Sequence, residues 1–275
     1  MSRRKSKQRP ETRAPAAASR PILPALLGGG VVIALVAAVA LFVVFSGGDD
    51  DGGSGDATKS AVIVDQLTLT QPNPDFVSEA RGVLAEAGYS VDYYAGEDVT
   101  VDLYRDLPNR GYDLVLLRVH AGITTEVDAA TGEQTGTEYV SLFTGEPYDE
   151  TKYSQEQLNR LGRATYVEGG DPLFGIGPEF VQESMEGDFG GAVVVMMGCD
   201  GLRSQRTAQA FLDRGASAFV SWTKPISGPH TDEATEKLLQ RLLIDGIPIE
   251  EAVAQTAAEV GPDPTYKGEL RVITG

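Results

Sequence analysis

The sequence predicts a mixed α/β domain, with a mostly parallel sheet flanked by helices, preceded by one N-terminal transmembrane helix. Strand-like and helix-like segments alternate from residue 60 onward, which is typical of parallel sheets covered by helices. Two short apolar runs, 114–119 and 192–197, are typical of strands buried on both faces. A third apolar run, Ala25–Phe45, contains no charged residue and is long enough to cross a bilayer.

The N-terminal segment predicts a membrane anchor. Residues 1–22 form a basic tail, and residues 23–46 form the predicted transmembrane helix, whose partner is the lipid bilayer. Because basic residues precede the helix and Asp49, Asp50 and Asp51 follow it, the positive-inside rule places the N-terminus in the cytoplasm and the C-terminal domain outside the cell membrane. The alternative is a cleaved signal peptide, whose apolar core is usually about 7–15 residues long. Residues 47–59 are rich in Gly, Asp and Ser and predict a flexible stalk.

The extracytoplasmic domain is expected to span residues 60–275. We expect its strands at 61–64, 89–94, 114–119, 192–197, 218–222 and 270–273. We expect its helices at 76–87, 101–107, 204–214, 231–244 and 249–260. The first helix has an Asn73-Pro74-Asp75 start signal and stops at Gly88.

Residues 123–190 interrupt this alternation and are expected to form an irregular acidic insertion. The segment carries 14 Asp/Glu against three Lys/Arg. Long loops at the active edge of an α/β sheet are usually functional or disordered. Solvated surface is one interpretation of this acidity, and a substrate-binding rim that prefers cationic groups is the other.

Composition excludes several classes of function. Residues 60–275 carry 35 Asp/Glu and 15 Lys/Arg, and so acidic a domain repels nucleic acid. A single cysteine excludes an internal disulfide framework and a cysteine-based zinc site. The sequence contains no glycine-rich phosphate loop and no metal-ligand cluster, so we expect neither a cofactor nor a metal.

His120 and Cys199 are the strongest candidates for chemistry. Each follows a buried strand, and ligands and reactive groups collect at the carboxyl ends of parallel strands. A nearby histidine can deprotonate a thiol and later protonate a leaving group. The helix expected to start near Ser204 would favour the thiolate of Cys199. The backbone N–H groups of Gly122 and Cys199 could stabilise an oxyanion.

This pattern resembles the caspase-like (clan CD) cysteine peptidases, which include caspases, gingipains, legumain, separase and bacterial CHAT domains. The resemblance is carried by a strand ending in His120, a strand ending in Gly198-Cys199, and the segments after them. Those segments, 208–216, 218–222 and 246–252, are similar to the CHAT and gingipain arrangement of a helix with a Gly-Ala turn, a strand ending near Trp, and a Gly-initiated helix containing Glu-Ala.

The resemblance implies a thiol protease in which His120 is the general base and acid and Cys199 is the nucleophile. Gly122 is the nearest equivalent of the family's oxyanion glycine. Ala121 stands where the family has glycine directly after histidine, and Gly198 replaces the commoner Ala, Gln or Ser. Ala121 favours a second hypothesis, a catalytically inactive module that binds a protein or peptide at the cell surface.

Three further interpretations stay open at the level of sequence. His230, at the start of a helix, could pair with Cys199 as in glutamine-amidotransferase-like folds, although a surface position is the simpler interpretation. Asp65, after the first strand, could mark a receiver-like acidic site, but no second acidic residue stands beside it. The acidic insertion predicts cleavage after Arg or Lys, with a rate that falls at high ionic strength.

Overall fold

A computed structural model describes residues 59–128 and 131–275 of the chain. The predicted tail, transmembrane helix and most of the stalk lie outside these residues. Within the described part, no helix combines the length and the apolar character needed to cross a membrane.

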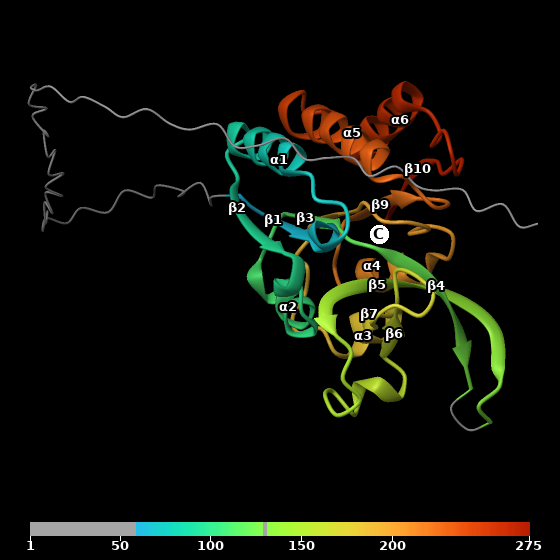
Figure 1. The fold of residues 1–275 in the computed structure, drawn as a ribbon. Coiled ribbons are helices and arrows are strands. Elements are labelled where there is room, and N and C mark those ends of the chain that lie inside the picture. Colours follow the sequence, from blue (N-terminus) through green and yellow to red (C-terminus); the bar gives the residue numbers. More distant parts are fainter. Residues whose placement is uncertain (1–58, 129–130) are drawn as a thin grey trace, which may run out of the picture. The chain divides into compact units, whose positions relative to one another are not determined.

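A six-stranded sheet forms the centre of the domain, with the strand order β10-β9-β8-β3-β1-β2 (Figure 1). Its strands are β1 (Ser60–Asp65), β2 (Ser90–Ala95), β3 (Leu114–Arg118), β8 (Val193–Met196), β9 (Ala218–Trp222) and β10 (Leu270–Thr274). All neighbours pair in parallel except β9 and β10, which are antiparallel. The sequence prediction of a mostly parallel sheet is therefore confirmed, as are all six of its strands.

Helices cover both faces of this sheet. They are α1 (Pro74–Glu86), α2 (Val101–Asp106), α3 (Pro178–Glu183), α4 (Gln205–Asp213), α5 (Gly228–Leu239) and α6 (Ile249–Val260). Short helical turns lie at Gln66–Leu69, Gly96–Asp98, Leu107–Arg110, Glu156–Leu158 and, as a π-helical continuation of α5, Gln240–Ile244. In α1 the side chain of Asn73 accepts the N–H of Phe76, and Pro74 occupies the first turn, where its missing N–H costs nothing.

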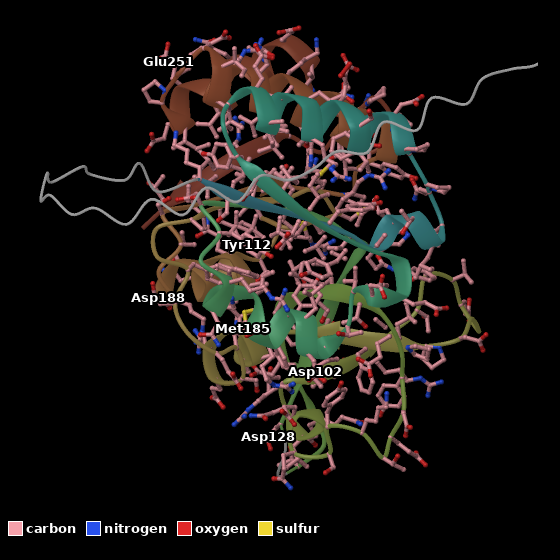
Figure 2. The ribbon with its side chains drawn as sticks, turned by 90° about the vertical axis from the view of Figure 1, so that its left-hand side faces the viewer. Asp102, Tyr112, Asp128, Met185, Asp188 and Glu251 are labelled. Carbon is pink, nitrogen blue, oxygen red and sulfur yellow. The ribbon has the colours of Figure 1, made fainter. Side chains whose placement is uncertain are left out.

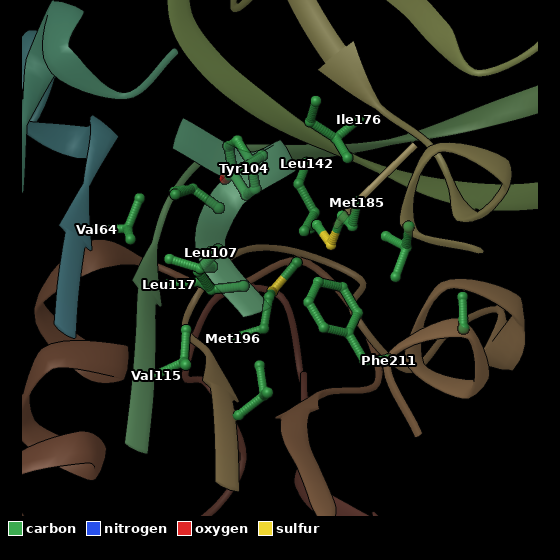
Figure 3. Close-up of a cluster of buried hydrophobic side chains, with 14 of the residues drawn as sticks. Val64, Tyr104, Leu107, Val115, Leu117, Leu142, Ile176, Met185, Met196 and Phe211 are labelled. Atoms are coloured by element: carbon green, nitrogen blue, oxygen red, sulfur yellow. The ribbon is translucent and has the colours of Figure 1, made fainter. Parts of the chain in front are cut away.

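The strand residues alternate between two hydrophobic cores. On β1, Ala61 and Ile63 join the core beneath α1, α5 and α6, whereas Val62 and Val64 join the core on the opposite face. Figure 3 shows this second core, in which side chains from β1, β3, β8, α2, α4 and a further sheet meet. Figure 2 shows Tyr112 and Met185, which belong to this second core, and Asp188 and Glu251 at the edge of the molecule. Because side chains alternate along a strand, the apolar runs serve both faces at once.

The segment 123–190 is not irregular, which corrects the sequence prediction. It contributes most of a second, antiparallel sheet with the order β4-β5-β7-β6. Its strands are β4 (Ala121–Val127), β5 (Gln134–Pro147), β6 (Leu161–Ala164) and β7 (Leu173–Ile176). Residues 140–146 of β5 are all buried, so this sheet folds because it packs on the second core. Gly, Thr and charged residues in these strands conceal the usual alternation of apolar and polar positions.

Candidate active site

His120 and Cys199 lie in the wall of one cavity at the carboxyl edge of the central sheet. Their strands, β3 and β8, are adjacent and parallel, with Leu117 opposite Met196. The cavity has a volume of about 270 Å³, and both residues line it. The sequence prediction that these two strand ends are neighbours is thus confirmed in the fold.

Side chains from two segments, 66–70 and the loop that carries Tyr166, hold His120 in place. Its backbone N–H donates to Oε1 of Gln66 at 2.9 Å, and its ring Nε2 is 2.7 Å from the hydroxyl oxygen of Thr70. The ring of Tyr166 packs against the imidazole, with 4.8 Å between centroids, and the Tyr166 hydroxyl accepts a hydrogen bond from Gln66. When the Thr70 hydroxyl oxygen accepts a hydrogen bond from Nε2–H, Nδ1 carries no proton and is the basic nitrogen of the ring.

Burial lowers the pKa of His120, and the positive charge of Arg118 lowers it further. The unperturbed pKa of histidine is about 6.5, so this imidazole is neutral at pH 7. A neutral ring is the form that can accept a proton from a thiol.

Cys199 is held by the main chain of the loop after β9. Its Sγ accepts the N–H of Ile226 at 3.4 Å and lies 3.6 Å from the carbonyl oxygen of the same residue. Burial raises the pKa of the thiol, the Ile226 N–H lowers it, and the charges of Asp200 and Asp263 raise it. The helix α4 begins at Gln205, six positions after Cys199, and stabilisation of a thiolate by this helix stays a prediction. The directions of the two pKa shifts make Cys199 a thiol and His120 a neutral imidazole at pH 7.

Two glycines allow the strand ends to approach closely. A Cβ at Gly198 would lie 2.3 Å from the carbonyl oxygen of Val119, and one at Gly201 would lie 2.1 Å from the hydroxyl oxygen of Ser221. Between them Asp200 has a left-handed φ of 58°, which turns the chain after the cysteine. The turn around Cys199 thus packs against the end of β3 through Gly198 and against β9 through Gly201.

The register of β4 determines which backbone N–H groups after His120 face β5. Phe143 donates its N–H to the carbonyl oxygen of His120, and Gly122 stands opposite Ser141 in the β4–β5 ladder. Because hydrogen-bonded pairs alternate in an antiparallel ladder, the N–H of Gly122 faces β5 and that of Ala121 faces away from it. The backbone N–H of Cys199 bonds to no group in the described part of the chain. The N–H of Ala121, rather than that of the predicted Gly122, is therefore the one that lies outside the β4–β5 ladder.

A buried ion-pair network lies beside the site. Arg118 on β3 bonds to Asp65 at 2.8 Å and to Asp232 at 2.9 Å, and all three side chains are at least 95% buried. Asp232 also accepts a hydrogen bond from Asn73, and Tyr93 donates to Asp65. This network fixes the end of β3 two residues before the histidine. Asp65 has a structural ion-pair role, so the receiver-like interpretation is wrong.

Asp263 stabilises the opposite wall of the cavity through hydrogen bonds. Its carboxylate accepts the N–H and the hydroxyl of Ser227, and the N–H groups of Thr265 and Tyr266. These bonds outweigh the cost of burial and hold its pKa at about 2. These bonds join the loop after β9 to the loop before β10. The second of these loops carries Tyr266 into the cavity wall.

His230 does not line this cavity, although Thr231 beside it does. Its Nε2 is 3.2 Å from the carbonyl oxygen of Gly261, and its ring packs 5.4 Å from that of Trp222. The arrangement gives His230 a structural role at the start of α5, whereas His120 and Cys199 line the same cavity.

The acidic insertion contributes no described residue to the cavity lining. Several of its carboxylates are engaged elsewhere, including Glu126 and Glu179 with Arg206, and Glu146 with Lys152. Its contribution to the site is Tyr166, which the sequence did not indicate. Thr70 and Gln66, also missed, follow β1 at the carboxyl edge, and that position is the signal that could have identified them.

Comparisons with known proteins identify no family for this chain. No family model matches the sequence, and no curated protein matches it. Among solved structures, the fold is similar to that of the Arg-specific cysteine proteinase gingipain R, with a TM-score of 0.43 and 11% sequence identity. The match covers 73% of this chain and 42% of that chain, so this chain corresponds to less than half of that protein's length. The function proposed for this chain therefore rests on the geometry of its own site.

Proposed function

We propose that this protein is a cysteine peptidase in which Cys199 is the nucleophile and His120 is the general base and acid. The observation that carries the proposal is that the two residues line one cavity at the carboxyl ends of adjacent parallel strands. The resemblance of the sequence to caspase-like peptidases agrees with this assignment.

The proposed reaction begins from the neutral pair. Sγ of Cys199 attacks the carbonyl carbon of the scissile peptide while its proton passes to His120, and the N–H groups of Ala121 and Cys199 stabilise the resulting oxyanion. Collapse of this adduct breaks the C–N bond, and His120 returns the proton to the leaving amine. Water, deprotonated by His120, then hydrolyses the thioester and regenerates the thiol.

The second candidate function is a catalytically inactive module that binds a peptide or protein. The observation that favours it is the state of the thiol, which is hydrogen-bonded to Ile226 and has a raised pKa. Ala121 contributes less to this alternative than the sequence indicates, because its backbone N–H faces away from β5 whatever its side chain.

Labelling of the full-length protein with a peptidyl acyloxymethyl ketone separates the two candidates. A peptidase should be modified at Cys199 alone, and the modification should vanish in His120→Ala. His230→Ala is the matched control and should label like the wild type. If Cys199 is labelled slowly, and at the same rate in the wild type and in His120→Ala, the result would support the binding module.

We further propose that the domain is attached to the cell membrane through residues 23–46 and lies outside the cytoplasm. The uncharged run Ala25–Phe45 and the charge contrast across it support this placement. Preferential cleavage after Arg or Lys stays a prediction from the acidity of the insertion, and no carboxylate among the described residues lines the cavity.

A further inference from the structure

The cavity beside Cys199 has an uncharged wall. Apart from His120 and Cys199, its lining consists of Leu67, Gln71, Val119, Met197, Gly198, Pro225, Ile226, Gly228, Thr231 and Tyr266. Most of these side chains are apolar, and the polar ones are neutral hydroxyl or amide groups. A cavity of this composition desolvates what enters it without supplying a formal charge.

Two of the carboxylates near the wall are already engaged, and a third, Asp200, does not line the cavity. Asp263 is fully buried, and both of its oxygens accept hydrogen bonds from Ser227, Thr265 and Tyr266. Asp232 is 3% exposed and is paired with Arg118. A cationic side chain in the cavity would therefore lose water without gaining a contact ion pair, which is a costly exchange.

The size of the cavity limits its occupant. Its volume of about 270 Å³ is below the roughly 300–1,000 Å³ typical of sites for whole small molecules. One large amino-acid side chain fits such a space. Because Cys199 lies in the wall, that side chain belongs to a residue next to the attacked bond.

We propose that this cavity receives an uncharged side chain, of the size of leucine, methionine or glutamine, from the substrate residue that precedes the scissile bond. Gln71 and Tyr266 are its specificity-determining residues, because they line it without belonging to the dyad. The inference rests on the proposed peptidase function and departs from the preference for Arg or Lys that the acidic sequence predicts.

Charged side chains of either sign lack a partner in the cavity. Asp200 and Asp263 raise the pKa of the Cys199 thiol and Arg118 lowers that of His120, so the charges around the cavity differ in sign between its two ends. Among the described residues, no Asp, Glu, Arg or Lys side chain lines it. We therefore expect uncharged side chains first, and Arg, Lys, Asp and Glu after them.

Gln71 provides an isosteric way to add a charge. It is exposed, and its Oε1 lies 2.4 Å from the position that a Cβ on Gly228 would occupy. Gln71→Glu thus places a carboxylate at the cavity with almost no change in volume, and a Lys or Arg side chain in the cavity would gain a partner.

The experiment measures labelling rates of the full-length protein with peptidyl acyloxymethyl ketones that differ only in the residue before the reactive carbonyl. We expect the Leu, Met and Gln probes to label Cys199 at least tenfold faster than the Arg, Lys and Asp probes. In Gln71→Glu the Arg and Lys probes should gain at least tenfold relative to Leu. Gln240→Glu, which adds the same charge after the far end of α5, should leave the order unchanged.

Tyr266 gives a second readout. Tyr266→Ala should reduce the advantage of the Leu and Met probes over the Arg probe, whereas Tyr266→Phe, which keeps the ring, should preserve it. Wild-type preference for Arg, Lys or Asp would overturn the inference and leave the peptidase intact. Absence of His120-dependent labelling with every probe would instead contradict the proposed function.

Discussion

The imidazole of His120 is positioned by residues that lie 46 to 54 positions away in the sequence. Gln66 binds its backbone, Thr70 binds its ring, and Tyr166 covers one side of it. A sequence reveals that a histidine follows a strand, but it does not reveal which hydroxyl will meet the ring. His120 and Cys199 could therefore be predicted, and the residues that orient them could not.

Thr70→Val tests the orienting hydrogen bond. The substitution keeps the shape of the side chain and removes the hydroxyl 2.7 Å from Nε2. One net hydrogen bond is worth about 1 kcal/mol, so we expect kcat to fall roughly five- to tenfold. KM should not change, because Thr70 does not line the cavity. Thr70→Ser should restore the rate, and an equal loss in both variants would contradict an orienting role.

The protonation states of the dyad predict a distinctive pH dependence. Burial raises the pKa of Cys199 and lowers that of His120, so the thiolate is scarce at neutral pH. The rate of alkylation of Cys199 by iodoacetamide should rise continuously from pH 7 into the alkaline range, beyond the ordinary thiol pKa of about 8.5. A rate that is already constant between pH 5 and pH 7 would reveal a thiolate–imidazolium pair and refute this assignment.

At the level of elements, the central sheet was predictable and the second sheet was not. The four inner strands of the central sheet, β1, β3, β8 and β9, are buried on both faces and therefore appear as apolar runs, as in Ala192–Met197. Residues 121–126 of β4 and 134–139 of β5 are exposed or half-buried, and a bulge between Thr125 and Val127 breaks the register of these two strands. Their pairing is set by packing on the core rather than by local pattern.

Gly198→Ala tests the close approach of β3 and β8. The added Cβ would lie 2.3 Å from the carbonyl oxygen of Val119, and backbone cannot yield as a side chain does. We expect the free energy of unfolding in urea to fall by about 1–3 kcal/mol. Gly82→Ala in α1 is the control, because nothing lies within 4 Å of its Cβ, and helix propensity should raise stability by up to ~1 kcal/mol. Similar effects of the two substitutions would argue against a steric requirement at Gly198.

For the whole molecule, the sequence predicts a topology that the described residues do not include. If residues 23–46 span the membrane with the N-terminus inside, protease added to intact cells should digest residues 60–275. The basic tail should survive until the membrane is permeabilised. Complete protection of the domain in intact cells would contradict this topology.

The central claim is that Cys199 and His120 cleave peptide bonds, and its most direct test is hydrolysis itself. The purified full-length protein is incubated with a proteome-derived peptide library, and new termini are identified by mass spectrometry. The account predicts new termini with the wild type and none with Cys199→Ala or His120→Ala. Cleavage at the same sites by Cys199→Ala, or no cleavage by the wild type despite a folded domain, would contradict it.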